Sequence, residues 1–119
     1  FFELFDSVGE NPSLEIVDSA ANALNEKACD AVIGIGGGSV LDAAKVVSCM
    51  KNFGKGSAAF YSKTPMKKEN KVPFFALPTT SGSGSEATDA AVLTLEDLGK
   101  KALHSKLLFS SVAIEAHKR

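Results

Sequence analysis

Three consecutive glycines, Gly36, Gly37 and Gly38, form the part of this sequence best suited to hold an anion. An apolar run at residues 31–35 precedes them and apolar residues at helical spacing follow from Ser39, so the pattern predicts a strand, a tight turn and a helix. Glycines in the turn let a ligand approach the backbone because they carry no side chain. The first N–H groups of a helix lack intrahelical partners and lie at the positive end of its dipole. The turn is therefore suited to a phosphate group.

The glycine turn matches a dinucleotide-binding fingerprint only in part. That fingerprint places G-x-G-x-x-G between a strand and a helix, and here Gly34 and Gly36 supply the first two glycines while Ser39 stands in the third place. The alternative is a plain strand-to-helix turn in which Ser39 caps the helix and Asp42 completes a capping box. A carboxylate suits a helix start but repels a phosphate at close range, so we expect Asp42 to cap or to meet a hydroxyl group.

A second segment whose side chains could bind a ligand is residues 78–86, which carry five hydroxyl side chains and two glycines. It follows residues 72–77 (VPFFAL), an apolar run that predicts a buried strand with Pro73 near its start. Hydroxyl groups can donate to phosphate, ribose or carboxamide groups, and ligands of open α/β sheets bind beyond the carboxyl ends of the strands. By composition the segment also fits a flexible linker. Its position after a strand favours an arrangement in which this segment and the glycine turn form the two walls of one cleft.

The segments around these two predict an α/β alternation. Residues 1–8 predict a strand, and a helix follows for which Asn11 is the cap and Pro12 the first residue. The β-α-β-α order of residues 1–51 predicts parallel strands joined by right-handed crossovers. The apolar face of the first helix is expected to contain Val17, Ala20, Ala21, Leu24 and Ala28. Residues 51–71 predict a solvated loop, with a short helix within it left open. The later segments predict a strand at residues 90–95, a less regular segment at 102–108 and a last short strand at 112–114.

Length and composition restrict the classes of function. The 119 residues have room for one domain, and 45% hydrophobic residues with a net charge of −1 argue against a nucleic-acid-binding face. No apolar run approaches the roughly 18 residues of a membrane helix, and the first residues lack the basic region of a signal peptide. Cys29, Cys49, His104 and His117 show no metal-ligand spacing, so a reduced cytoplasmic setting without a metal site is expected.

Together the two segments resemble the iron-dependent, or group III, alcohol dehydrogenases. That family carries a GGGSxxDxAK segment and a PTTxGTGSE segment; this chain has GIGGGSVLDAAK and, about 40 residues later, ALPTTSGSGSEATDAAVLT. The resemblance extends from about residue 5 to residue 114. It implies a Rossmann-like α/β fold, with a parallel sheet and flanking helices, that is incomplete at both ends. Residues 1–119 would then be part of a dinucleotide-binding domain for NAD or NADP, without the family's C-terminal helical metal domain.

The resemblance assigns cofactor contacts to both segments and to one lysine. Residues expected at the diphosphate are Gly37, Gly38 and Ser39, with Asp42 near the nicotinamide end; those expected on the opposite wall are Thr79, Thr80 and Ser83. Lys101 resembles a lysine that reaches the nicotinamide ribose. A solvated lysine beside Lys100 is an equal alternative for that position.

The resemblance implies hydride transfer between a nicotinamide cofactor and a small alcohol, aldehyde or ketone, with iron or another divalent metal polarising the substrate oxygen. The family's metal ligands, an Asp and three His, have no match here, so His117 is not expected to bind metal. We therefore expect no catalytic or metal-binding residue in this sequence and no turnover by this chain alone. The implied partners are the dinucleotide and the substrate, with neither nucleic acid nor membrane, and a homo-oligomer is left open.

The sequence leaves two alternatives to a dehydrogenase. A non-enzymatic nucleotide-binding module, or a truncated remnant, would also explain the glycine turn without metal ligands. A phosphate-site ATPase is disfavoured because G-x-x-x-x-G-K-[ST] does not occur in the sequence.

Overall fold

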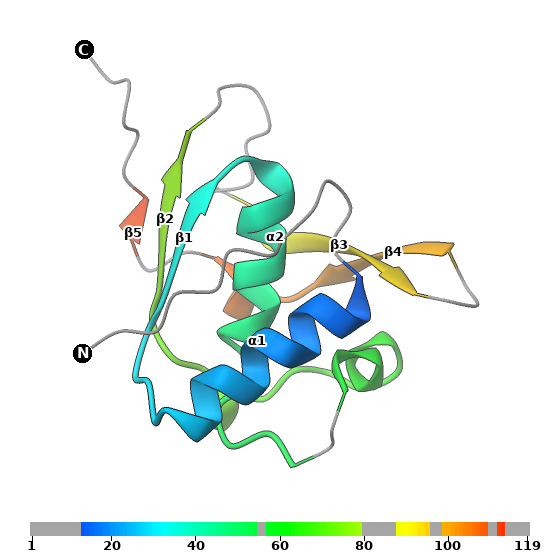
Figure 1. The fold of residues 1–119 in the computed structure, drawn as a ribbon. Helices are drawn as coiled ribbons and strands as arrows, with labels where there is room; N and C mark the ends of the chain where they lie inside the picture. Colours follow the sequence, from blue (N-terminus) through cyan, green and yellow to red (C-terminus); the bar gives the residue numbers. More distant parts are fainter. Residues whose placement is uncertain (1–12, 55–56, 80–87, 96–98, 110–111, 114–119) are drawn as a thin grey trace.

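The computed structural model describes residues 13–54, 57–79, 88–95, 99–109 and 112–113 (Figure 1). Over these residues the elements are, in chain order, α1 (Leu14–Glu26), β1 (Val32–Gly36), α2 (Gly38–Val47), the 3₁₀ helices η1 (Ala58–Ser62) and η2 (Lys68–Asn70), β2 (Phe74–Pro78), β3 (Ala90–Leu95), β4 (Gly99–His104), the 3₁₀ helix η4 (Lys106–Leu108) and β5 (Val112–Ala113). The strand predicted at residues 1–8 lies outside the described residues.

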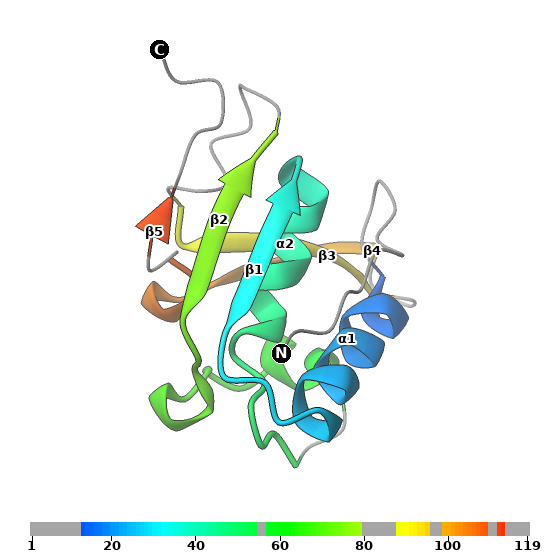
Figure 2. The same ribbon diagram turned by 60° about the vertical axis from the view of Figure 1, so that its left-hand side comes forward.

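A parallel sheet with the strand order β1-β2-β5 positions the two segments of interest. β1 and β2 run side by side over five residue pairs, from Val32 opposite Phe74 to Gly36 opposite Pro78. α2 packs against both strands and α1 packs against α2, as Figure 2 shows. The prediction of an α/β fold with a parallel sheet and flanking helices is therefore confirmed.

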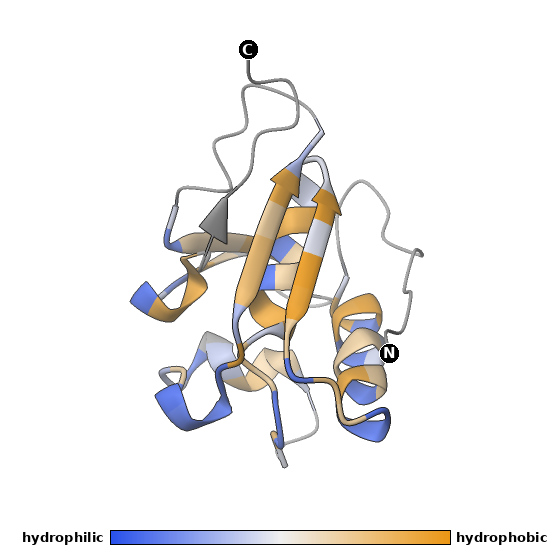
Figure 3. Cartoon of the chain, turned by 90° about the vertical axis from the view of Figure 1, so that its left-hand side faces the viewer, coloured by the Kyte–Doolittle hydropathy of each residue, from blue (hydrophilic) through white to orange (hydrophobic). Residues whose placement is uncertain are grey.

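The two faces of the parallel sheet differ in burial. Phe74 and Ala76 of β2 are fully buried with Leu41 of α2 in a small apolar cluster. Ile33 and Ile35 of β1 point to the other face and are 62% and 60% exposed. Figure 3 views the sheet from this side and shows apolar strands with no described helix in front of them. The side chains that alternate along the strands thus divide the sheet into a face packed against α2 and an open face.

A second sheet contains the antiparallel pair β3 and β4. The strand predicted at residues 90–95 is confirmed, whereas the prediction of a less regular segment at 102–108 was wrong for its first residues. β4 extends to His104 and places buried Leu103 opposite buried Ala91. The pairing with β3 provides the partner that makes this polar segment a strand, and such a tertiary contact has no local sequence signal.

The start of α1 differs from the sequence prediction. The helix begins at Leu14 and its N-cap is Ser13, whose hydroxyl accepts from the N–H of Ile16 over 3.4 Å. Ser13 caps the helix as well as Asn11 would and lies closer to the first apolar turn. Asn11 and Pro12 themselves lie outside the described residues.

The predicted apolar face of α1 is largely confirmed. Val17, Ala21 and Leu24 are buried and Ala20 packs against the same core. Ala28 does not belong to this face, because it lies beyond the helix end with a φ of 52° and is exposed. The chain turns there toward β1, so the helical period no longer applies.

Residues 51–71 contain two short helices, η1 and η2, which agrees with the short helix left open for this loop, but the segment is less solvated than predicted. Ala58 and Tyr61 of η1 are buried in the main apolar core, and Met66 packs against it. The Tyr61 hydroxyl donates to the carbonyl of Cys49. The segment therefore closes the side of the core at the end of α2. Within the described residues, no helix has the length and apolar character needed to cross a membrane.

Candidate functional site

Gly37 and Thr79 lie beside each other at the carboxyl-terminal edge of the parallel sheet. Their preceding residues, Gly36 and Pro78, are paired in β1 and β2, and the Thr79 N–H donates to the Gly36 carbonyl with an N···O distance of 2.9 Å. The glycine turn and the beginning of the hydroxyl-rich segment therefore leave the sheet at the same edge. The prediction that both segments lie at one edge is confirmed for the residues that the structure describes. Thr80 and Ser83 lie outside those residues.

The backbone of the turn explains why it contains glycines. Gly36 has a φ of 154°, and a Cβ atom there would lie 2.9 Å from Cγ2 of Val40. This position therefore requires glycine for both conformation and space. Gly37, the next residue, is the N-cap of α2 with a φ of −85°, and no side chain caps the helix.

The capping role considered for Ser39 was wrong. α2 begins at Gly38, so Ser39 is already inside the first helical turn. Gly37 is the extended residue before the helix, and its carbonyl accepts from the N–H of Leu41 over 3.0 Å. The helix starts two residues earlier than a serine cap at position 39 would allow, with Gly37 as its N-cap and Gly38 as its first residue. These two glycines and Ser39 are half-buried.

Asp42 does not complete a capping box, because Gly37 is the N-cap of α2 and no side chain caps that helix. A contact of Asp42 with a hydroxyl group stays a prediction. Its Oδ2 accepts from the N–H of Val92 in β3 over 3.1 Å, and its Oδ1 lies 3.7 Å from Nζ of Lys45. The carboxylate lies one turn beyond the helix start, where it reaches β3 and can tie α2 to that strand.

Lys45 is a residue that the sequence reasoning missed. Its side chain is 0% exposed, and its Nζ donates to Oγ1 of Thr88 and to the carbonyl of Ala90, each over 2.8 Å. A sequence signal was present, because Asp42 and Lys45 are three residues apart on a predicted helix and can form an ion pair. The direction of the lysine toward the protein interior was not predictable from that spacing.

Lys101 lies in β4 opposite Leu93 of β3. The β3–β4 pair is tied to α2 through Lys45 and Asp42, so Lys101 belongs to a unit that contacts α2. A contact between Lys101 and a cofactor remains a prediction.

The described residues do not form a site for iron. They contain no group of three His, Cys, Asp or Glu side chains placed to share a metal ion. The Cys49 thiol is fully buried, donates to the Leu107 carbonyl over 3.8 Å, and has its pKa raised by that burial. The ordinary geometry of a transition-metal centre, with several converging ligands, is not met by this part of the chain.

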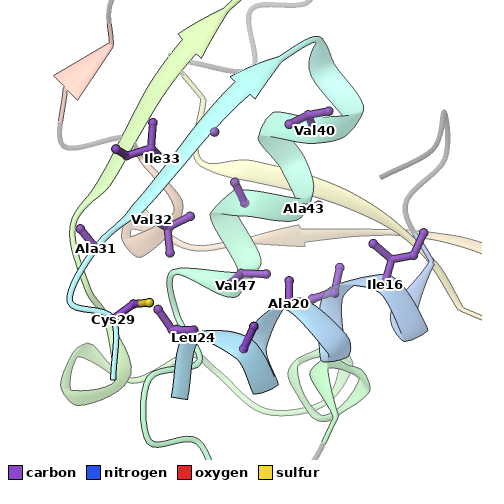
Figure 4. Close-up of a pocket in the computed structure, with 14 residues that line it drawn as sticks. Ile16, Ala20, Leu24, Cys29, Ala31, Val32, Ile33, Val40, Ala43 and Val47 are labelled. Atoms are coloured by element: carbon purple, nitrogen blue, oxygen red, sulfur yellow. The ribbon is translucent and has the colours of Figure 1, made fainter. Parts of the chain in front are cut away.

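An apolar cavity of about 180 Å³ lies between α1, β1 and α2 (Figure 4). Its lining contains no charged side chain, and among the lining residues are Ile16, Ala20, Leu24, Val32, Val40 and Val47. A cavity of this kind does not suit a diphosphate, which needs hydrogen-bond donors or positive charge. The edge of the sheet is therefore the stronger candidate for a nucleotide site.

The fold and the turn together define a Rossmann-like α/β domain, and comparisons with known proteins identify its family. The family model for iron-containing alcohol dehydrogenases matches residues 2–116. The chain belongs to the iron-containing alcohol dehydrogenase family.

Individual relatives match nearly all of this chain. The long-chain primary alcohol dehydrogenase AdhA of Thermoanaerobacter ethanolicus is 34% identical over 115 residues, which are 96% of this chain and 29% of that protein. The probable alcohol dehydrogenase EutG of Escherichia coli K12 is 38% identical over 111 residues, 92% of this chain and 28% of that protein. This chain therefore spans less than a third of the length of these relatives.

A solved structure gives the same result. Sulfoacetaldehyde reductase from Bifidobacterium kashiwanohense, determined in complex with NAD⁺, superimposes with a TM-score of 0.87 at 35% identity, over 96% of this chain and 31% of that one. The similarity thus extends to the arrangement of the elements as well as to the sequence.

Proposed function

We propose that residues 1–119 form the NAD- or NADP-binding part of a metal-dependent alcohol dehydrogenase. The observation that carries this proposal is the hydrogen bond of 2.9 Å between the Thr79 N–H and the Gly36 carbonyl, because it joins the glycine turn and the hydroxyl-rich segment at one edge. Nucleotides bind at this edge of parallel α/β sheets. Membership of the iron-containing alcohol dehydrogenase family and the NAD⁺ complex of the sulfoacetaldehyde reductase relative support it.

In this proposal the backbone at the start of α2 binds the cofactor diphosphate. The N–H groups of Gly37 and Gly38 act as donors at the positive end of the helix dipole, and Ser39 adds a hydroxyl. The remaining contacts are assigned to Asp42 near the nicotinamide end, to Thr79, Thr80 and Ser83 on the opposite wall, and to Lys101 at the nicotinamide ribose.

The bound nicotinamide would supply the chemistry of hydride transfer between an alcohol and an aldehyde or ketone. The residues of this chain would bind and orient that cofactor rather than act on the substrate. Since the described residues do not fit a metal ion, the ligands for the family's iron or other divalent metal would come from outside them. We further propose a cytoplasmic location, which the unpaired thiols of Cys29 and Cys49 support.

Calorimetric titration of the chain with NAD, NADP and ADP tests the proposal. We expect binding of a dinucleotide by the unmodified chain and at least about a tenfold loss of affinity in Gly37→Val, because the valine side chain blocks the approach of the diphosphate to the backbone. The φ of −85° at Gly37 is open to valine, so the variant should keep its circular dichroism spectrum.

Gly54→Val is a matched control for this experiment. Gly54 is exposed, and a Cβ atom there would meet nothing within 4 Å. The control should bind like the unmodified chain. Absence of heat with every nucleotide would refute the proposed function, and unchanged affinity in folded Gly37→Val would refute the proposed site.

A further inference from the structure

We propose that Lys45 is a positioning residue of the cofactor site. Its buried amine joins Thr88 and Ala90, which follow the hydroxyl-rich segment, to the helix that begins at the glycine turn. The inference rests on the proposed function, because it concerns how the two walls of that site are held. It adds a residue that makes none of the proposed cofactor contacts and acts through Thr88, Ala90 and Asp42.

The first argument is the burial of the amine. Lys45 is 0% exposed and lies among the largest fully buried side chains of the described residues. Removing an ammonium group from water is costly, and fixing a long side chain also loses rotamer entropy. An apolar side chain of similar volume would often be at least as stable in such a position. Stability alone therefore does not explain a lysine here.

The second argument is the location of the partners of Lys45. Nζ donates to Thr88 Oγ1 and to the Ala90 carbonyl, each over 2.8 Å. Thr88 is the first described residue after the hydroxyl-rich segment, and β3 begins at Ala90. β3 passes along α2 at this point (Figures 1 and 2). Lys45 thus fixes the place where the chain returns from that segment.

The beginning of the same segment is fixed to the same unit. The Thr79 N–H donates to the Gly36 carbonyl at the end of β1. Thr79 and Thr88 are the described residues on either side of residues 80–87, and each is bonded to the unit that contains the glycine turn. Fixing the flanking residues of a chain segment reduces the entropy lost when that segment binds a ligand, so these two bonds favour binding.

The third argument is charge. The Lys45 ammonium lies 3.7 Å from Oδ1 of Asp42, one turn from the N-terminus of α2. A carboxylate at that place opposes the binding of a diphosphate, and a neighbouring positive charge reduces this opposition. Lys45 thereby serves both the geometry and the electrostatics of the proposed site.

The test compares Lys45→Met and Thr88→Val with Lys51→Met as the control. Lys51 is a matched lysine because its Nζ also donates to a backbone carbonyl, that of Cys29, over 2.7 Å. Cys29 precedes β1, so this bond lies at the end of the strand away from the glycine turn. Calorimetry gives the Kd for NAD, and thermal unfolding of each variant shows that it is folded at the temperature of the titration. We expect affinity to fall about tenfold in Lys45→Met and about threefold in Thr88→Val, and to be unchanged in Lys51→Met.

Two readouts separate positioning from a purely structural role. The double variant Lys45→Met/Thr88→Val should bind no more weakly than Lys45→Met, because the bond that Thr88→Val removes is already absent from Lys45→Met. The loss of NAD affinity in Lys45→Met should also be smaller at high salt, because salt screens the Asp42 carboxylate that the lysine no longer compensates. The loss of affinity in Thr88→Val should not depend on salt in this way. A structural role alone would lower the unfolding temperature and leave the Kd of the folded protein unchanged.

The outcomes are distinguishable from those for the proposed function. If the unmodified chain binds NAD and both folded variants bind it equally well, the inference is wrong and the proposed function stands. If Lys45→Met does not fold, Thr88→Val decides, since Thr88 is exposed and the variant should fold. If the unmodified chain binds no nucleotide, the proposed function fails and the inference with it.

Discussion

Tyr61, Ser48 and Lys71 show how single polar side chains stabilise the interior of this protein. The Tyr61 hydroxyl donates to the Cys49 carbonyl, and Ser48 Oγ donates to the Lys45 carbonyl over 2.6 Å and accepts from Lys71 Nζ over 2.8 Å. No buried side-chain N or O atom in the described part of the chain lacks a hydrogen-bond partner. These bonds fix the end of α2, so the interior is specified by polar as well as apolar contacts.

Tyr61→Phe should lower the free energy of unfolding by about 1 kcal/mol at pH 7, because the Cys49 carbonyl loses its donor. Burial raises the pKa of the Tyr61 phenol above its ordinary value of 10.0. The stability from the protonated phenol is therefore fully present below pH 10 and is lost as the pH rises further, since the unfolded chain then ionises first. Urea unfolding at pH 7 and from pH 9.5 upward should show a shallower alkaline decline in the variant. Parallel declines would contradict this role of the phenol.

The packing of α2 against β1 depends on the absence of a side chain at Gly34. A Cβ atom there would lie 3.0 Å from Cβ of Ala44, 3.1 Å from Cε1 of Phe74 and 3.2 Å from Cδ2 of Leu41. α2 can approach β1 this closely only if the residue of β1 that faces it, Gly34, has no side chain. The approach also places the N-terminus of α2 at the edge of the sheet where Thr79 emerges.

Gly34→Val should therefore destabilise the protein by about 1–3 kcal/mol through overpacking between the strand and the helix. Gly54→Val, at a site with open space, should have a much smaller effect. Chemical denaturation of both variants gives the comparison. Equal stability of the two would mean that α2 does not lie as close to β1 in solution as the contacts of Gly34 require.

The elements that the sequence predicted correctly are those with a strong local pattern. β1, α2, β2 and β3 each carry an apolar run or a helical period, and the glycine turn marks the start of α2. β4 was missed because its residues become a strand by pairing with β3. The inward direction of Lys45 was missed for the same reason, since its partners at Thr88 and Ala90 are more than 40 residues away.

On the scale of the whole molecule, the site depends on a simple rule of parallel sheets. Strands that run in the same direction end at one edge, so the segments after β1 and β2 were predictable as neighbours from their order alone. How α2 and the β3–β4 pair lock together was not predictable, because the contacts of Asp42 with Val92 and of Lys45 with Ala90 depend on the packing of distant elements.

The same packing predicts which substitutions in the sheet layer are tolerated. Ile35 is 60% exposed on the open face, whereas Leu41 is 0% exposed beneath the other face. Ile35→Thr should change the free energy of unfolding by less than about 0.5 kcal/mol, and Leu41→Ala should lower it by about 2–5 kcal/mol because it leaves a cavity. Urea unfolding of the two variants measures this difference. A cost for Ile35→Thr close to that for Leu41→Ala would show that the open face is covered in solution.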